Sequence, residues 1–212
     1  MRGRLISVEG LDGTGKTTVC EALAARLRDH EVQVLRLREP GGTAVGEHIR
    51  GLLADPSRSL TPRTELLLFA AARAELAETV IRPALASGSW VLLDRYIDST
   101  LAYQGAGRQL GDELVHTVNA VATGGLLPDR TLLLHAPVEV RARRIGGRGE
   151  APDRLERAGD ELFARTQARY EQLLGEQPER VRAVDASGTP DEVAALAWAA
   201  TADLLQSAVA RR

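Results

Sequence analysis

The sequence has 212 residues, of which 44% are hydrophobic and 3% aromatic, and its formal net charge at pH 7 is -2. We expect one soluble globular domain over residues 1–212 with an aliphatic core, no nucleic-acid partner and no membrane span. The first residues lack the apolar stretch of a signal peptide, and a single cysteine excludes an internal disulfide. A cytoplasmic protein is therefore expected.

Five short apolar runs predict β-strands at residues 5–8, 32–37, 90–93, 131–134 and 181–184. Between them, apolar residues recur with helical spacing, which predicts helices at residues 17–28, 65–85, 113–122, 160–174 and 191–209. Short apolar strands that alternate with helices are typical of a parallel sheet covered on both faces. We therefore predict an α/β fold with a five-stranded parallel sheet flanked by helices.

The strongest motif follows the first predicted strand. Residues 10–17 read Gly-Leu-Asp-Gly-Thr-Gly-Lys-Thr, which matches a phosphate-binding P-loop in its expected place between a strand and a helix. Lys16 is the only lysine in the chain, which argues against a chance glycine-rich turn. The motif predicts a P-loop NTPase fold with Thr17 as a Mg²⁺ ligand. The expected ATP-binding residues of this loop are Gly10, Leu11, Asp12, Gly13, Thr14, Gly15, Lys16, Thr17 and Thr18.

The scarcity of lysine narrows the class of P-loop protein. A GTPase normally reads guanine with an Asn/Thr-Lys-x-Asp motif, which this chain lacks because Lys16 is its sole lysine. Motors and large ATPases usually need a longer chain. A small kinase remains, and it requires an acceptor site together with positive charge over the transferred phosphoryl group.

Candidate acceptor residues follow the third predicted strand and lie on one predicted helix. Asp94 and Arg95 come at the carboxyl end of that strand, where open α/β sheets bind ligands. There Asp94 could hold Mg²⁺ and Arg95 could grip a phosphate, although a strand-end ion pair is the alternative. Phe69 and Arg73 share one helical face, where a ring and a guanidinium suit a nucleotide base; a core phenylalanine is the alternative.

Together these segments resemble bacterial thymidylate kinase. The resemblance rests on the P-loop, on Arg-Glu-Pro-Gly-Gly-Thr at residues 38–43, on Phe-Ala-Ala-Ala-Arg at residues 69–73 and on the Asp-Arg-Tyr and Ala-Tyr-Gln-Gly runs within residues 94–105. Order and spacing agree over nearly the whole chain. The runs at residues 38–43 and 94–105 are far more specific than the P-loop.

The resemblance implies a dTMP site at the matching positions. Its residues would be Asp12, Glu39, Arg50, Phe69, Arg73, Arg95, Thr100, Tyr103 and Gln104. Phe69 would stack on thymine, while Arg73 and Thr100 would read its polar edge. Arg95, helped by Arg50, would hold the acceptor phosphate.

The resemblance also assigns Asp12 to the 3′-hydroxyl of the acceptor and Tyr103 to the 2′ position, which it would crowd to favour deoxyribose. Gln104 would line the same pocket. Ser99 is interpreted as a helix cap. A homodimer is implied as well, with the helices after the second and third strands as its interface.

Arginines gather in residues 141–157, where glycines interrupt the run. A charge run is usually a solvated face, but a kinase needs positive charge and no other source is visible. We interpret the segment as an exposed, mobile lid. The resemblance implies that the lid carries the catalytic arginine when the P-loop lacks one, as here with Gly13. Arg148 matches best, and Arg143 and Arg154 are second choices, near ATP or bridging to the acceptor side.

The expected function is in-line transfer of the ATP γ-phosphoryl group to dTMP, giving dTDP for dTTP biosynthesis, with Mg²⁺ as the cofactor. The expected catalytic residues are Lys16, Arg148, Arg95 and Asp12. Two alternatives stay open. One is another nucleotide or nucleoside kinase, and the other is a non-catalytic nucleotide-binding regulator.

Overall fold

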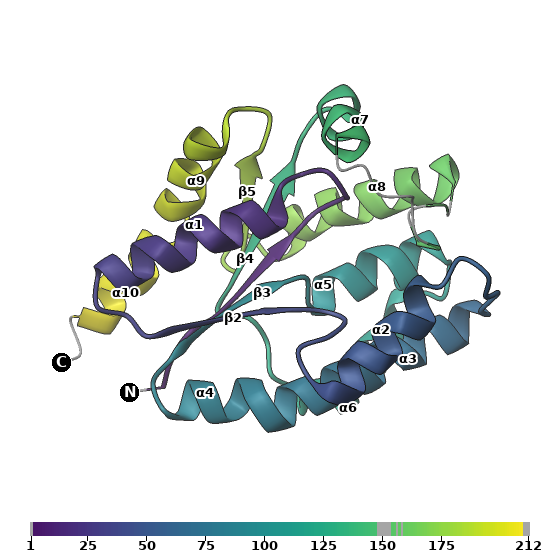
Figure 1. Ribbon diagram of the computed structural model, residues 1–212, viewed down its shortest axis with the longest axis horizontal. Helices are drawn as coiled ribbons and strands as arrows, with labels where there is room; N and C mark the ends of the chain where they lie inside the picture. The colour runs from purple at the N-terminus through teal and green to yellow at the C-terminus, as the bar shows by residue number, and fades with distance from the viewer. Residues whose placement is uncertain (1, 148–153, 156, 158, 210–212) are drawn as a thin grey trace.

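A computed structural model describes residues 2–147, 154, 155, 157 and 159–209 (Figure 1). Its five strands form one parallel sheet in the order β2-β3-β1-β4-β5. The strands are β1 (Leu5–Glu9), β2 (Val34–Arg38), β3 (Trp90–Asp94), β4 (Arg130–His135) and β5 (Val181–Asp185). The predicted α/β fold with a five-stranded parallel sheet is therefore confirmed.

Helices cover both faces of the sheet (Figure 1). One face is covered by α1 (Lys16–Asp29), α9 (Pro190–Ala199) and α10 (Ala202–Val209). The other is covered by α3 (Pro62–Leu76), η1 (Ala77–Ile81), α4 (Arg82–Ala86), η2 (Leu101–Gly107) and α8 (Asp160–Glu176). Further out, α2 (Ala44–Ala54) and α6 (Asp112–Thr123) pack against α3.

Alternation along the strands sorts the core into two layers. Leu92 of β3 packs in the cluster that includes α1 and α9, whereas its neighbours Val91 and Leu93 pack in the cluster that includes η1 and α4. β4 does the same, because Leu132 and Leu133 belong to clusters on opposite faces. Strands buried on both faces read as continuous apolar runs, which is why the sequence revealed them.

The predicted helix at residues 65–85 is helical throughout, but a π-helix, η1, separates its two α-helical parts, α3 and α4. It begins earlier, at Pro62, where the Thr61 hydroxyl caps the backbone N–H of Thr64. The five residues of η1 form a π-helix before α4. Pro83 lies two residues beyond the end of η1. Since proline has no N–H and its ring crowds the preceding turn, the wider π-helical turn relieves the clash.

Three helical segments were not predicted: α2, the run of α5 (Ile97–Thr100) into η2, and α7 (Val138–Gly146). Helix α7 overlaps the arginine-rich segment of residues 141–157, so the first part of that segment, up to Gly146, is helical. The predicted helix at residues 191–209 is two helices, α9 and α10. Among the described residues, no helix is both long and apolar enough to cross a bilayer.

Candidate active site

A cavity of about 730 Å³ lies beside the P-loop, and its lining includes the carboxyl ends of β2 and β3. In this strand order the connections after the neighbouring strands β1 and β3 run to opposite sides of the sheet, and ligands bind at the carboxyl ends of such a pair. Its lining includes the predicted residues Asp12, Gly15, Lys16, Thr17, Thr18, Glu39, Arg50, Phe69, Arg73, Asp94, Arg95, Thr100, Tyr103 and Gln104. The structure therefore brings these residues, which are far apart in sequence, to one cavity.

The P-loop wraps around the side chain of Lys16. Gly10, Gly13 and Gly15 have φ angles of +134°, +81° and +91°, in a range that L side chains rarely adopt. The Lys16 ammonium donates to the carbonyl oxygens of Gly10 at 3.2 Å and Leu11 at 3.0 Å. Burial, and then the nearby Arg95, lowers the pKa of Lys16, and carboxylates partly offset the shift.

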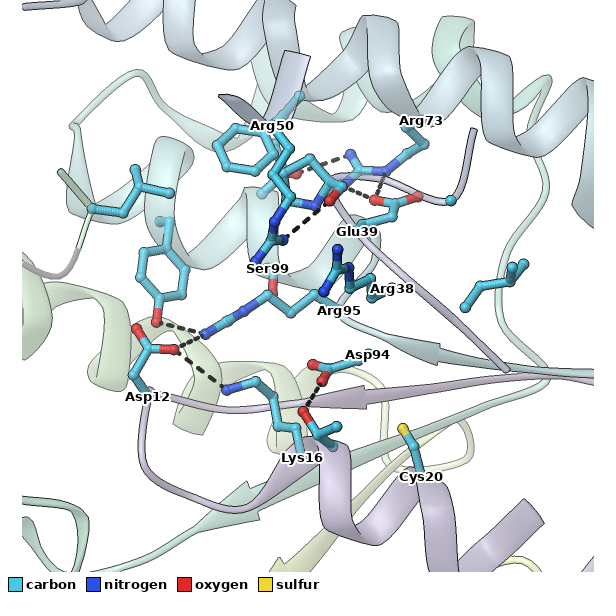
Figure 2. Close-up of a pocket in the computed structure, with 18 of the residues that line it drawn as sticks. Asp12, Lys16, Cys20, Arg38, Glu39, Arg50, Arg73, Asp94, Arg95 and Ser99 are labelled. Atoms are coloured by element: carbon cyan, nitrogen blue, oxygen red, sulfur yellow. Dashed lines mark hydrogen bonds and ion pairs between the residues drawn. The ribbon is translucent and has the colours of Figure 1, made fainter. Parts of the chain in front are cut away.

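Thr17 and Asp94 meet at the start of α1. Asp94 lies opposite Val8 in the β1–β3 pairing, so the strand end reaches the P-loop as predicted. The Thr17 hydroxyl donates to Asp94 Oδ2 at 2.6 Å (Figure 2). A hydroxyl and a carboxylate at a phosphate-binding loop are oxygen donors of the kind that Mg²⁺ prefers.

Asp12 joins two cations at the floor of the cavity (Figure 2). Its Oδ1 lies 2.5 Å from Arg95 Nη2 and 3.6 Å from Lys16 Nζ. The Arg95 guanidinium also donates to the Gly10 carbonyl at 3.1 Å and lies 5.0 Å from the centre of the Tyr103 ring. Arg95 has a φ of +71°, a strained backbone for a residue with a side chain. Strain of this kind persists where surrounding contacts determine the conformation.

A buried carboxylate lies behind Arg95. Glu9 Oε2 accepts hydrogen bonds from Ser99 Oγ at 2.5 Å and Tyr170 OH at 3.1 Å, and Oε1 accepts from the Tyr96 N–H at 2.7 Å. Ser99 Oγ in turn accepts from Arg95 Nη1 at 3.1 Å. Burial, reinforced by Asp98, raises the pKa of Glu9 to about 7.

The interpretation of Ser99 as a helix cap is wrong, because Tyr96 occupies the N-cap position of α5 and Ser99 lies within the helix. Its hydroxyl connects Arg95 to Glu9 instead. Sequence reasoning also missed Glu9 and Tyr170. An acidic residue ending an apolar strand was a signal for Glu9, whereas nothing local marks Tyr170, which arrives from α8.

Arg73 is a second buried cation, 1% exposed. Its Nε and Nη2 contact Glu39 Oε2 at 2.8 and 2.7 Å, and Nη1 donates to Thr100 Oγ1 at 2.9 Å and Asn119 Oδ1 at 2.7 Å. Nη2 also donates to the Tyr96 carbonyl at 3.1 Å. Burial raises the pKa of Glu39, and Arg73 opposes this shift. All three guanidinium nitrogens thus bond to the protein.

Three other predicted residues reach the cavity from separate elements. Phe69 of α3 lines it and packs against the apolar cluster of Ile49 and Leu53. Arg50 of α2 extends toward it and donates to the Pro40 carbonyl at 3.1 Å (Figure 2). Gln104 of η2 is buried and donates through Nε2 to Glu65 at 2.8 Å.

Two arginines of the arginine-rich segment, Arg144 and Arg154, hydrogen-bond to other parts of the chain. Arg144 of α7 donates to the carbonyls of Ala186 at 2.9 Å and Gly188 at 3.0 Å, and more weakly to the P-loop carbonyl of Gly13 at 3.4 Å. Arg154 pairs with Glu65 at 2.7 Å.

The other two predicted arginines are Arg143 and Arg148. Arg143 is exposed on α7, next to Arg144, which contacts the P-loop. Arg148 lies outside the described residues.

The P-loop leaves no room for a side chain at Gly13. A Cβ there would lie 2.6 Å from the carbonyl oxygen of Arg141 on α7, and the φ of +81° would strain any other residue. The first turn of α7 therefore lies directly against the loop.

Comparisons with known proteins agree with this geometry. The family model described as thymidylate kinase matches residues 8–196. The chain is 46% identical over 206 residues to a thymidylate kinase of Halorhodospira halophila, covering 96% of both chains. It is 44% identical over 207 residues to that of Rhizorhabdus wittichii, covering 97% of this chain and all of the relative. A third relative, from Thermomicrobium roseum, is 46% identical over 201 residues, with 95% of each chain covered.

Proposed function

The chain belongs to the thymidylate kinase family, and from that premise we propose that it transfers the γ-phosphoryl group of ATP to dTMP, giving dTDP and ADP. One observation carries the proposal. Asp12 contacts both Lys16 of the P-loop and Arg95 of the neighbouring strand end, so a donor-phosphate loop and an acceptor-phosphate cation face the same cavity. Phosphoryl transfer needs both groups within reach of one another.

The acceptor side of the proposal uses the lining of the cavity. Arg95 and Arg50 hold the acceptor phosphate, Phe69 stacks on thymine, and Asp12 accepts from the 3′-hydroxyl. Arg73 and Thr100 already hydrogen-bond to each other, which supports their joint action at the edge of the base. Glu39 fixes Arg73 from the opposite side.

The ring of Tyr103, held against Arg95, crowds the 2′ position and favours a deoxyribose. Buried Gln104 lines the same pocket.

The reaction requires no general base, since the attacking group of dTMP is a phosphate anion. Catalysis then rests on in-line positioning and on charge stabilisation over the equatorial oxygens. Lys16 and the backbone of residues 10–18 hold the donor phosphates. Arg148 supplies the catalytic guanidinium and Arg143 approaches ATP.

Mg²⁺ fits Thr17 and Asp94, whose oxygens lie 2.6 Å apart at the mouth of the P-loop. An ion held there would offset the negative charge of the ATP phosphates. Thr17 would contact it directly and Asp94 directly or through water. In the structure the two residues hold each other, which keeps both side chains oriented toward that position.

We also propose a homodimer. The helices α2, α3 and α6 form one layer, and each carries outward-facing apolar residues, of which Leu67 is 59% and Val121 is 82% exposed. Exposed large apolar side chains on one helical layer support an interface there. We further propose a single domain over residues 1–212 and a cytoplasmic location, which the buried free thiol of Cys20 supports.

The test is ADP release with ATP and Mg²⁺, measured separately with dTMP, dUMP, dCMP, dGMP and AMP, beside an Arg148→Ala variant. Strong stimulation by dTMP that falls at least about 10³-fold in the variant is expected. Equal stimulation by another monophosphate would make the chain a different kinase. ATP binding without any acceptor-dependent product would make it a regulator.

A further inference from the structure

Glu65 of α3 is a buried acid outside the reaction described above. It is 1% exposed, and its two carboxylate oxygens accept hydrogen bonds from three side chains. Oε1 accepts from Gln104 Nε2 at 2.8 Å and Arg108 Nε at 3.1 Å. Oε2 accepts from Arg108 Nη2 at 3.0 Å and Arg154 Nη1 at 2.7 Å.

The surroundings keep this carboxylate charged. Burial acts to raise the pKa of Glu65, but hydrogen bonds from Arg108, Gln104 and Arg154 outweigh it, and the pKa falls below its ordinary value. Charge-assisted bonds of this kind are shorter and stronger than neutral ones. Removing the charge would leave two arginines facing a neutral group, one of them, Arg154, only 11% exposed.

Arg154 is docked by more than this ion pair. Its Nε donates to the Leu53 carbonyl at 2.8 Å, and its backbone N–H donates to the Ala54 carbonyl at 3.2 Å. Residue 154 is thus fixed to the end of α2 as well as to α3. The next residue, Leu155, lines the cavity together with Phe69. The docking of Arg154 therefore determines where one wall of the cavity stands.

The same carboxylate orients Gln104. An ionised carboxylate only accepts hydrogen bonds, so the amide nitrogen of Gln104 must face Glu65. Its amide oxygen is then turned to the opposite side. Gln104 also lines the cavity, so one charged group sets the position of two lining residues that are 51 positions apart in the sequence, Gln104 and Leu155.

We propose that Glu65 is a positioning residue for the acceptor nucleotide, which it serves by holding Gln104 and the Arg154–Leu155 pair in place together. The proposal rests on the proposed function, because it takes dTMP as the acceptor. Glu65 does not contact the reacting groups. Its effect should therefore fall on acceptor affinity and leave the ATP site unchanged.

The test compares Glu65→Gln, Arg154→Gln and the double variant with Glu161→Gln. Glu161 is a matched control, since it also pairs with an arginine, Arg165 at 3.5 Å, but is 93% exposed. We expect the KM for dTMP to rise about tenfold in each single variant, because both remove the charge-assisted bond between Glu65 and Arg154. The KM for ATP should stay within about twofold. The KM for dTMP in the double variant should be no higher than in the worse single variant, because both changes remove the same Glu65–Arg154 contact.

Limited trypsin digestion gives a readout that does not depend on activity. Cleavage of the Arg154–Leu155 bond, followed by mass spectrometry, should be at least about tenfold faster in Glu65→Gln than in the wild type or Glu161→Gln. If Glu65→Gln fails to fold by circular dichroism, Arg154→Gln, which lacks this tryptic site, tests the same contact through the KM for dTMP. Unchanged cleavage, an unchanged KM for dTMP, or multiplying effects in the double variant would overturn the proposal. Protection of the bond in a wild-type protein that does not phosphorylate dTMP would instead overturn the proposed function.

Discussion

Arg95 Nη2 lies 2.5 Å from Asp12 Oδ1, which joins the loop after β3 to the P-loop after β1. The same carboxylate oxygen lies 3.6 Å from Lys16 Nζ. Asp12 thereby stands between the cation assigned to the donor phosphates and the cation assigned to the acceptor phosphate. Its carboxylate offsets the positive charge of Lys16 and Arg95, a role that substrate phosphates would otherwise fill.

Replacing Asp12 by Asn tests this arrangement. The substitution keeps the shape and an acceptor oxygen but removes the charge that orients Arg95. We expect kcat/KM for dTMP to fall about 10- to 100-fold, in line with about 1.5–3 kcal/mol for a hydrogen bond to a charged group. Steady-state kinetics would measure it, with the melting temperature as a control for folding. An unchanged kcat/KM would show that Asp12 does not act on the acceptor.

Replacing Arg73 by Met tests the buried ion pair with Glu39. The variant leaves the Glu39 carboxylate buried without its cation, which typically costs about 3–5 kcal/mol of unfolding free energy. Urea denaturation would measure the loss. Arg63→Met is the control, because Arg63 lies on the same helix and is exposed, and a change within about 0.5 kcal/mol is expected there. Similar losses in the two variants would contradict the prediction.

Glu9 predicts a pH dependence of stability. Its pKa is raised from 4.5 to about 7 in the fold, so between these values the folded chain binds more protons than the unfolded chain. The contribution of Glu9 therefore lowers the unfolding free energy as the pH rises through this window, by up to about 3 kcal/mol. Arg95, Asp98 and Tyr170 face the same carboxylate. A comparison of the wild type with a Glu9 variant keeps all three of them unchanged.

The measurement is the melting temperature of the wild type and Glu9→Gln from pH 5 to 8. Glutamine removes the titration, so the wild type should lose stability relative to the variant as the pH increases. Parallel curves for the two proteins would mean that Glu9 keeps an ordinary pKa.

The proposed dimer predicts a change in mass on adding charge to the α2, α3 and α6 layer. Leu67→Glu combined with Val121→Glu places carboxylates on an apolar interface, where unpaired charge is costly. We expect sedimentation at dimer mass for the wild type and monomer mass for the variant. Leu196→Glu, on α9 at the opposite face of the sheet, should not change the mass. A wild type that sediments as a monomer would refute the dimer.

The strands β1, β3 and β4 were predictable because they are buried on both faces, yet the predicted apolar runs stopped too early. β1, β3 and β5 each continue one residue further, into Glu9, Asp94 and Asp185. The hydrogen-bond ladder extends past the apolar residues to where the polar groups of the site begin. Two of these three terminal acids, Glu9 and Asp94, bond to residues of the site.

The helices show where local signals fail. α2 contains Gly46 and Gly51, which lower helix propensity, although Thr43 caps its start with a bond to the Gly46 N–H at 2.9 Å. The break between α9 and α10 carries no glycine or proline. There the Thr201 hydroxyl donates to the Trp198 carbonyl at 2.9 Å, a local bond that competes with the helix.

The residues of the site divide in the same way. Sequence motifs identified those that are close to a strand end, such as Lys16 and Arg95. Glu65 and Tyr170 could not be found in this way, because their roles come from tertiary contacts with distant segments. Tertiary contacts between distant segments leave no periodic pattern and no motif spacing in the sequence.

The close approach of Gly13 to the Arg141 carbonyl means that the P-loop and α7 must fit each other. A chimera that carried an arginine at position 13 would have to move α7 outward, and α7 also anchors the β5–α9 loop through Arg144. Exchanging the P-loop alone between relatives with and without that arginine would therefore disrupt the fold locally. Exchange of the P-loop and residues 138–157 as one cassette is the design that this packing permits.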